Sequence, residues 1–211
     1  MQRDVIKIYP QEPSSIKLIL TLAIAGLISG IAIIAIYEAT LPTITAYKAK
    51  VLREAVFKVL PKVTKIQKLQ YIDNKFQPID SEENSTEIIY AGYDSEDNLI
   101  GYAINASGSG FQDTIQILYG YIPQNNLIVG MEVLDSRETP GLGDKIYKDA
   151  DFKANFKSLT VKPAIVFVKK GMKSASNEVD SITGATISSR AVVKIINKSN
   201  NKWLDRIHME Q

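Results

Sequence analysis

The stretch Asp180-Ser181-Ile182-Thr183-Gly184-Ala185-Thr186 places a small, hydroxyl-rich turn directly before an amphipathic segment. Apolar residues then recur at helical spacing, which predicts a helix beginning near Thr186; they are Ile187, Ala191, Val192, Ile195 and Ile196. The first turn of a helix has free backbone N–H groups and the positive end of the helix dipole, which suit a phosphate. Gly184 and Ala185 add almost no bulk beside the Thr186 hydroxyl. On local physics alone, an ordinary helix cap is the favoured interpretation.

Two further loops follow predicted strands. In Glu138-Thr139-Pro140-Gly141-Leu142-Gly143, the proline pushes Thr139 into an extended conformation, and the two glycines permit positive φ. The result is a sharp, fixed loop that offers backbone N–H and C=O groups. In Ser107-Gly108-Ser109-Gly110-Phe111, the glycines permit unusual backbone positions and Phe111 is suited to covering a ring. A plain connection between strands explains the second loop equally well.

Composition limits the classes of function. The 211 residues suffice for one domain plus an anchor, with 25 basic and 23 acidic side chains and a net charge of +2. The lysines are scattered, so nothing favours nucleic acid as a partner. The absence of cysteine excludes disulfides, zinc–thiolate sites and iron–sulfur clusters within the chain. The single histidine, His208, lies near the end, where we expect a frayed terminus, so no multi-histidine metal site is expected.

An uncharged run of 20 residues from Leu18 to Tyr37 predicts a transmembrane helix. At about 1.5 Å per residue it spans roughly 30 Å, the thickness of a hydrocarbon core. Residues 1–17 then form a short tail, 38–60 a helix leaving the membrane, and 61–211 the main domain. Lysine and arginine counts on the two sides are equal, but Lys17 abuts the run at one end and Glu38 at the other. This favours a cytoplasmic N-terminus and an extracytoplasmic domain.

The remaining pattern predicts an α+β domain with an antiparallel sheet flanked by helices. A helix is expected from Ala46 to Leu60, where Pro61 stops it, and a polar loop or edge excursion from Asp73 to Ser85. Two hairpins are predicted, pairing 87–92 with 98–105 and 113–121 with 127–134. Residues 149–158 are helix-like, and 161–168 read as a buried strand rich in Val and Ile.

The stretch 180–186 resembles the flavinylation motif of FMN-binding domains, which is Asp, two residues, Ser or Thr, Gly, Ala, and Thr or Ser. In that family a flavin transferase joins FMN to the last residue through a phosphoester. The resemblance implies that Thr186 carries FMN covalently, that Asp180 is read by the transferase, and that Ser181, Thr183, Gly184 and Ala185 form the close approach. The stretch 138–143 matches a second hallmark of the family, a loop that lies against the isoalloxazine ring of the flavin.

The same resemblance extends to further contacts. It implies that Glu138, Thr139 and Leu142 lie at the flavin, and it makes Gly108, Gly110 and Phe111 candidates for cofactor contact. Lys169, just past the predicted strand, would favour anionic reduced flavin if it lay near the pyrimidine edge. A solvated lysine at a strand end is the favoured explanation of that residue.

The whole arrangement is similar to the family of G subunits of the Rnf complex, an ion-translocating ferredoxin–NAD oxidoreductase of bacterial membranes. The resemblance implies an electron-carrier subunit of the inner membrane, with other Rnf subunits, a flavin transferase and lipid as partners. No catalytic residue and no stand-alone enzymatic activity are expected, because the predicted span contains no ionisable residue.

Three alternatives stay open at the level of sequence. The sister family, the C subunits of the sodium-translocating NADH–quinone reductase, shares both motifs, but its chains are usually longer. A membrane-tethered binding or assembly module would use the glycine loops only as turns. A hydrolase with a Ser or Thr nucleophile lacks support, since no Gly-x-Ser-x-Gly elbow occurs.

Overall fold

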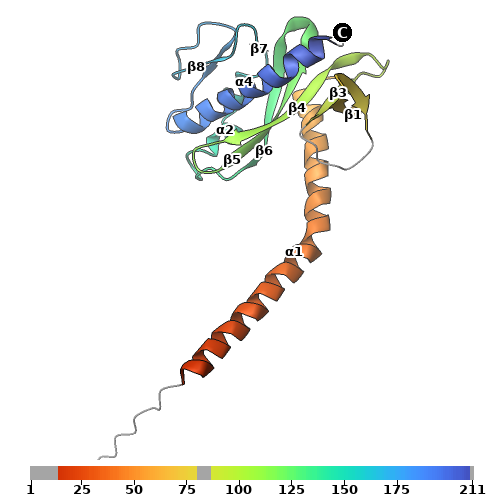
Figure 1. The fold of residues 1–211 in the computed structure, drawn as a ribbon. Coiled ribbons are helices and arrows are strands. Elements are labelled where there is room, and N and C mark those ends of the chain that lie inside the picture. Colours follow the sequence, from red (N-terminus) through yellow and green to blue (C-terminus); the bar gives the residue numbers. More distant parts are fainter. Residues whose placement is uncertain (1–13, 80–86, 210–211) are drawn as a thin grey trace, which may run out of the picture. The chain divides into compact units, whose positions relative to one another are not determined.

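A computed structural model describes residues 14–79 and 87–209 of the chain. The chain divides into two compact units, one reaching to Lys48 and one beginning at Ala49. The first unit is helical from Ser15 onward, and the second contains the sheet and the remaining helices (Figure 1). The expected tail of residues 1–17 lies almost entirely outside the described residues.

Helix α1 runs without interruption from Ser15 to Val59 and includes Pro42. It contains the apolar run predicted to cross a membrane, and it is the one helix among the described residues with the length and composition to do so. Its isoleucine and leucine side chains are exposed through this run, among them Leu22, Ile28 and Ile34. Such exposure is unfavourable in water and favourable in a hydrocarbon layer. The predicted helix of residues 46–60 is the last part of this same helix.

The second unit is built on a seven-stranded antiparallel sheet of order β2-β1-β3-β4-β5-β6-β7. The strands are β1 Lys65–Ile72, β2 Lys75–Pro78, β3 Ile88–Tyr93, β4 Leu99–Ser109, β5 Thr114–Ile122, β6 Leu127–Ser136 and β7 Leu159–Thr160. A 3-10 turn, Pro123–Asn125, joins β5 to β6 and ends on Asn126 in the left-handed region. Both predicted hairpins, and with them the α+β fold class, are confirmed.

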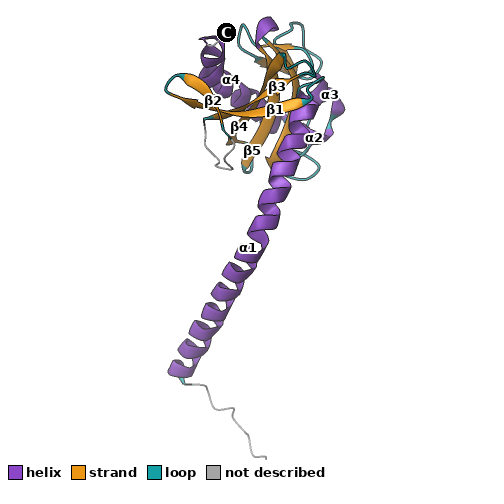
Figure 2. Cartoon of the chain, turned by 90° about the vertical axis from the view of Figure 1, so that its right-hand side faces the viewer, coloured by secondary structure: helices purple, strands orange, loops and turns teal. Residues whose placement is uncertain are grey.

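The sheet has an edge hairpin that the sequence pattern did not predict. Strands β1 and β2 pair around Asp73 and Asn74, both at positive φ, at the start of the region expected to be a polar loop or an edge excursion (Figure 2). Asn and Asp tolerate this conformation better than other side chains, which explains the tight turn. The rest of the predicted loop, residues 80–85, lies outside the described residues.

The segment after β6 holds short elements and the long C-terminal helix. These are α2 Lys145–Lys148, α3 Ala150–Ala154, β8 Val166–Val168, β9 Glu178–Asp180 and α4 Thr186–Met209. The predicted helix 149–158 is shorter than expected. The predicted buried strand 161–168 was wrong: only Val166–Val168 is strand, it is partly exposed, and it pairs in parallel with β9. A proline within the segment, Pro163, cannot donate to a strand ladder.

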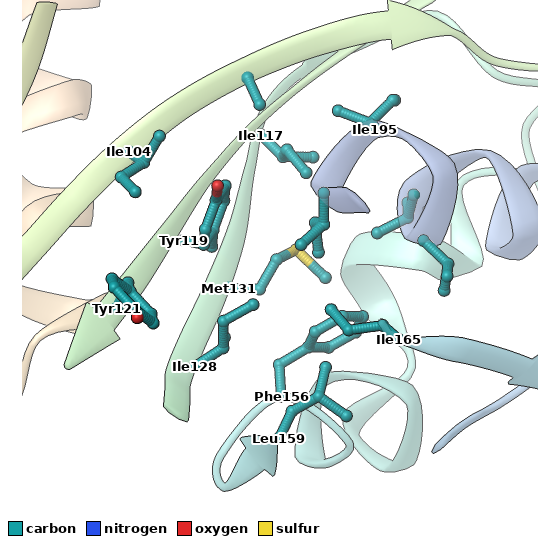
Figure 3. Close-up of a cluster of buried hydrophobic side chains, with 14 of the residues drawn as sticks. Ile104, Ile117, Tyr119, Tyr121, Ile128, Met131, Phe156, Leu159, Ile165 and Ile195 are labelled. Carbon is teal, nitrogen blue, oxygen red and sulfur yellow. The ribbon is translucent and has the colours of Figure 1, made fainter. Parts of the chain in front are cut away.

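Alternating side chains of the central strands build a core on each face of the sheet. Helix α4 covers one face with Val192, Ile195 and Ile196, against side chains such as Ile104, Ile117, Tyr119 and Met131 (Figure 3). The other face holds Ala103 and Leu118 against Val56, Val59 and Leu60. A Cβ at Gly130 would lie 2.8 Å from the Val59 Cα, so the glycine permits the end of α1 to lie on the sheet.

The terminus of α4 is ordered, contrary to the expectation for His208. The His208 Nε2 atom lies 3.0 Å from the Tyr121 hydroxyl, and the neighbouring Ile207 is fully buried. The histidine was expected to fray because of its place in the sequence. Instead, packing of α4 along the sheet holds it.

Candidate functional site

The turn before α4 has a conformation that requires glycine. The Ala185 N–H donates to the Ile182 carbonyl at 3.0 Å, and Gly184 between them has a φ of +83°. This is a type II turn, in which the third residue needs positive φ. Helix α4 begins immediately afterwards at Thr186, which is exposed. Within the described residues, the N–H groups of Thr186, Ile187 and Ser188 have no acceptor, so they point outward from the helix start.

Hydroxyl groups on the buried side hold this turn in place. The Ser189 hydroxyl donates to the Ala185 carbonyl at 2.7 Å and accepts from the Ile182 N–H at 3.2 Å. The Ser181 hydroxyl, also buried, accepts from the Lys170 N–H at 3.0 Å. Asp180, at the end of β9, accepts from the Lys173 N–H at 3.1 Å. Ser181 and Asp180 therefore fix the approach to the turn through backbone groups of the preceding loop.

The Glu138 carboxylate joins the three predicted loops. It is 5% exposed, and its Oε1 accepts from the N–H groups of Phe111 and Gln112 at 2.9 and 3.0 Å. Its other oxygen accepts from the Ser188 hydroxyl in the first turn of α4. Both oxygens are thus used inside the protein. Glu138, which the resemblance places at the cofactor, brings the loop containing Phe111 and the first turn of α4 together.

Burial and hydrogen bonding shift the pKa of the Glu138 carboxyl in opposite directions. Burial alone raises the pKa of Glu138, because it penalises the charged form. The hydrogen bond from Ser188 and those from the backbone of Gln112 and Phe111 outweigh burial, and the pKa lies below its ordinary value. Glu138 is consequently ionised at neutral pH, and its negative charge is bound by the loops that it holds.

Two predicted glycines permit this close approach. A Cβ at Gly143 would lie 2.6 Å from Glu138 Oε2 and 2.9 Å from the Ser188 hydroxyl oxygen. A Cβ at Gly110 would collide with Glu138 Oε1 and lie 2.7 Å from Ile115 Cδ1. Gly108 has a different environment, because it lies within β4 and faces α4. A Cβ added to Gly108 would lie 2.7 Å from Ile195 Cγ1. Gly108 therefore serves the packing of α4 on the sheet.

Each of the three joined segments presents one large apolar side chain to solvent. Phe111 is 64% exposed, Leu142 51% and Ile187 55%. Leu142 lies near the turn, since its Cδ2 is 3.9 Å from the Cβ position of Gly184. Thr139 shapes the loop from inside: its hydroxyl donates to Gln112 Oε1 at 2.9 Å, and its carbonyl accepts from the Leu142 N–H at 3.1 Å. An aromatic ring bound here would cover apolar surface that is otherwise exposed to water.

The residues present fit a ligand with both a phosphate and an aromatic ring. The exposed Thr186 hydroxyl and the three free N–H groups suit a phosphate, and the half-buried Lys145 of α2 adds a positive charge beside them. Helix α2 packs beside α4 (Figure 1). Among the described residues, no group of three or more His, Cys, Asp or Glu side chains is placed to hold a metal ion.

Four residues that shape these loops or lie beside them were not singled out in the sequence, namely Gln112, Lys145, Ser188 and Ser189. Each acts through a contact between segments or across a helical turn, and serines in a first helical turn are too common to be informative. Lys169 is the opposite case. It is exposed in the turn after β8, and within the described residues its side chain forms no hydrogen bond or ion pair. The structure thus does not link Lys169 to the loops joined by Glu138.

Replacing Gly143 by alanine is expected to separate the loop from α4. The new methyl would meet both the Glu138 carboxylate and Ser188 at contact distances that no Cβ adopts, so the carboxylate must move. We expect a loss of about 1–3 kcal/mol in the free energy of unfolding, measured by denaturant titration. Gly141→Ala is the matched control. There, nothing lies within 4 Å of a Cβ, and only the φ of +78° opposes the change. Equal losses for both variants would contradict the contact with Glu138.

Comparison with known proteins finds a similar domain family and two similar folds. Residues 110–200 match the FMN-binding domain family, and this region contains Glu138, the loop 138–143 and Thr186. Two crystal structures share the fold. Shewanella oneidensis NqrC matches with a TM-score of 0.56 at 18% identity, over 74% of this chain and 88% of that one. The C subunit of the Na⁺-translocating NADH-quinone reductase from Parabacteroides distasonis matches with a TM-score of 0.55 at 19% identity, over 69% and 78%.

Several proteins are similar to this chain in sequence. The G subunit of the ion-translocating oxidoreductase complex of Methanosarcina acetivorans is 28% identical over 87% of this chain and 91% of its own. The G subunit of the Na⁺-translocating ferredoxin:NAD⁺ oxidoreductase complex of Acetobacterium woodii is 36% identical over 53% and 52%. Its proton-translocating counterpart in Clostridium ljungdahlii is 29% identical over 82% and 83%. The chain is therefore similar to FMN-binding domains over residues 110–200, and similar in sequence to the G subunits of ion-translocating oxidoreductase complexes.

Proposed function

We propose that this protein is the electron-carrier subunit of an ion-translocating ferredoxin–NAD oxidoreductase complex, carrying FMN esterified to Thr186. One observation supports the attachment most strongly. Thr186 combines an exposed hydroxyl with three free N–H groups at the first turn of α4, beside apolar side chains of three loops. Homology to the G subunits supports the complex, and the FMN-binding domain supports the cofactor.

FMN supplies one- and two-electron redox chemistry when bound, and the protein supplies position and surroundings. Thr186 anchors the phosphate, and Phe111, Leu142 and Ile187 border the place for the ring. Thr183, Gly184 and Ala185 shape the turn so that the hydroxyl is accessible. Forming the ester replaces the hydroxyl proton of Thr186 with the FMN phosphoryl group. The donor is an activated form of FMN such as flavin adenine dinucleotide, whose pyrophosphate bond breaks and releases AMP. A flavin transferase performs that step and recognises Asp180.

The membrane arrangement forms the second part of the proposal. Residues 18–37 span the inner membrane once, with residues 1–17 in the cytoplasm. Residues 38–60 leave the membrane, and residues 61–211 form the extracytoplasmic domain. The apolar surface of α1 supports the span, and Lys17 at one end with Glu38 at the other supports the orientation. Lipid and the other subunits of the complex surround the chain.

The proposal is tested on protein purified from its native membrane. Intact-mass measurement is expected to show the chain plus one FMN minus water, and tryptic mapping to place that increment on the peptide containing Thr186. The denatured band is expected to fluoresce as a flavin, because an ester survives unfolding. A colourless protein with an unmodified Thr186 peptide would instead favour a tethered assembly module without cofactor.

A further inference from the structure

The Lys145 side chain lies close to the turn that precedes Thr186. Its Nζ lies 3.8 Å from the position that a Cβ would take on Gly184, two residues before the hydroxyl. The backbone of α2 sets this placement, because Lys145 opens the helix directly after the loop 138–143. The same loop brings Leu142 close to that Cβ position as well, at 3.9 Å.

The charges around Lys145 leave it available for a ligand. Asp144, which is buried, already has a partner: its Oδ2 accepts from Lys148 Nζ at 2.6 Å. This hydrogen bond is the main reason that the pKa of Asp144 lies below its ordinary value. Lys145 adds only its charge to that effect, and its side chain forms no hydrogen bond or ion pair within the described residues.

Arg190 is a second cation near the start of α4. It lies one helical turn after Thr186, and its guanidinium sits over the Phe167 ring at 5.1 Å from the centroid. A cation–π contact of this kind holds the group against the protein. Lys145 has no comparable contact within the described part of the chain, so its long side chain can turn toward a phosphate without losing a partner there.

We propose that Lys145 binds the phosphate of the FMN ester and is a positioning residue for its attachment. This inference depends on the proposed attachment to Thr186. An ester between FMN and threonine is a phosphodiester with one negative charge. The three free N–H groups of α4 supply hydrogen bonds and partial charge, and Lys145 supplies the full positive charge that neutralises it. The ammonium group would hold the phosphorus centre near the Thr186 oxygen while the ester forms.

The experiment compares full-length variants of Lys145 with wild type in detergent. Apo-protein made without a flavin transferase is incubated with the transferase and flavin adenine dinucleotide, and covalent flavin is followed by fluorescence in denaturing gels. We expect Lys145→Gln to lower the initial rate about tenfold and Lys145→Arg to restore most of it, since arginine keeps the charge. In the loaded protein, the ³¹P resonance of the ester is expected to shift in Lys145→Gln relative to wild type.

Two variants serve as controls. Lys194→Gln removes an equal charge from an exposed position of α4 beyond the first two turns, and Arg190→Gln removes the cation one turn after Thr186. Both are expected to keep the wild-type ³¹P resonance, and thermal melting confirms that each variant is folded. A Lys145→Gln resonance that coincides with wild type, or a shift found in Arg190→Gln instead, overturns the assignment. Wild-type protein that accepts no flavin at Thr186 would refute the attachment itself, which is a separate outcome.

Discussion

Replacing Thr186 by valine is expected to abolish covalent flavin completely while the protein folds normally. Valine has the shape of threonine without the hydroxyl, so no oxygen remains to form the ester. The side chain is exposed and forms no hydrogen bond within the described residues, so the free energy of unfolding should change by less than about 0.5 kcal/mol. Flavin fluorescence of the denatured band and a thermal melt of the same sample measure both effects.

The controls for this variant separate the hydroxyl from its surroundings. Thr186→Ser keeps a hydroxyl at the helix start and is expected to retain flavin, since the motif accepts either residue. Thr114→Val makes the same chemical change at another exposed threonine, at the start of β5, and should leave the flavin band intact. A fluorescent Thr186→Val band with its flavin on another residue would show that the attachment site is misassigned.

Glu138→Ala is expected to have the largest effect of any variant that does not touch the attachment residue. It removes the acceptor of the Phe111 and Gln112 N–H groups and of the Ser188 hydroxyl, and leaves these donors without a partner. We expect a loss of about 3 kcal/mol in the free energy of unfolding. Flavin transfer should also fall by about an order of magnitude, because a misplaced loop disturbs the geometry around Thr186. Denaturant titration and in-gel fluorescence measure the two quantities.

The pH dependence of stability tests whether the negative charge of Glu138 causes its contribution to the free energy of unfolding. The folded-state pKa of Glu138 is below its unfolded value, so its contribution to stability is fully present above the unfolded pKa, about 4.3. It is lost as the pH falls through the folded pKa. The stability difference between wild type and Glu138→Gln should therefore be constant from about pH 6 to 8 and shrink below about pH 4.5. A difference that stays constant down to about pH 3 would show that the carboxylate charge contributes nothing.

Local patterns predicted much of the fold because their physical causes are local. Alternating apolar residues and the turns at 94–97 and 123–126 predicted both hairpins, and the apolar spacing after Thr186 predicted α4. The prediction was wrong where distant contacts decide. Residues 161–168 have the composition of a buried strand, yet only three of them pair, and their partner β9 follows a loop. His208 is held by Tyr121, which is remote in sequence.

The sequence by itself determined the chemical groups of this protein: an apolar helix long enough for a bilayer, a threonine at a helix start, and glycines where the turn needs positive φ. Each follows from hydropathy, helix geometry or backbone sterics within a few residues. Only the tertiary structure decided how the loops meet. Glu138 bonds Phe111 and Ser188, which are 27 and 50 residues away, and Lys145 of α2 lies close to Gly184 in the turn before α4. Such contacts depend on the packing of the whole domain, which no local pattern encodes.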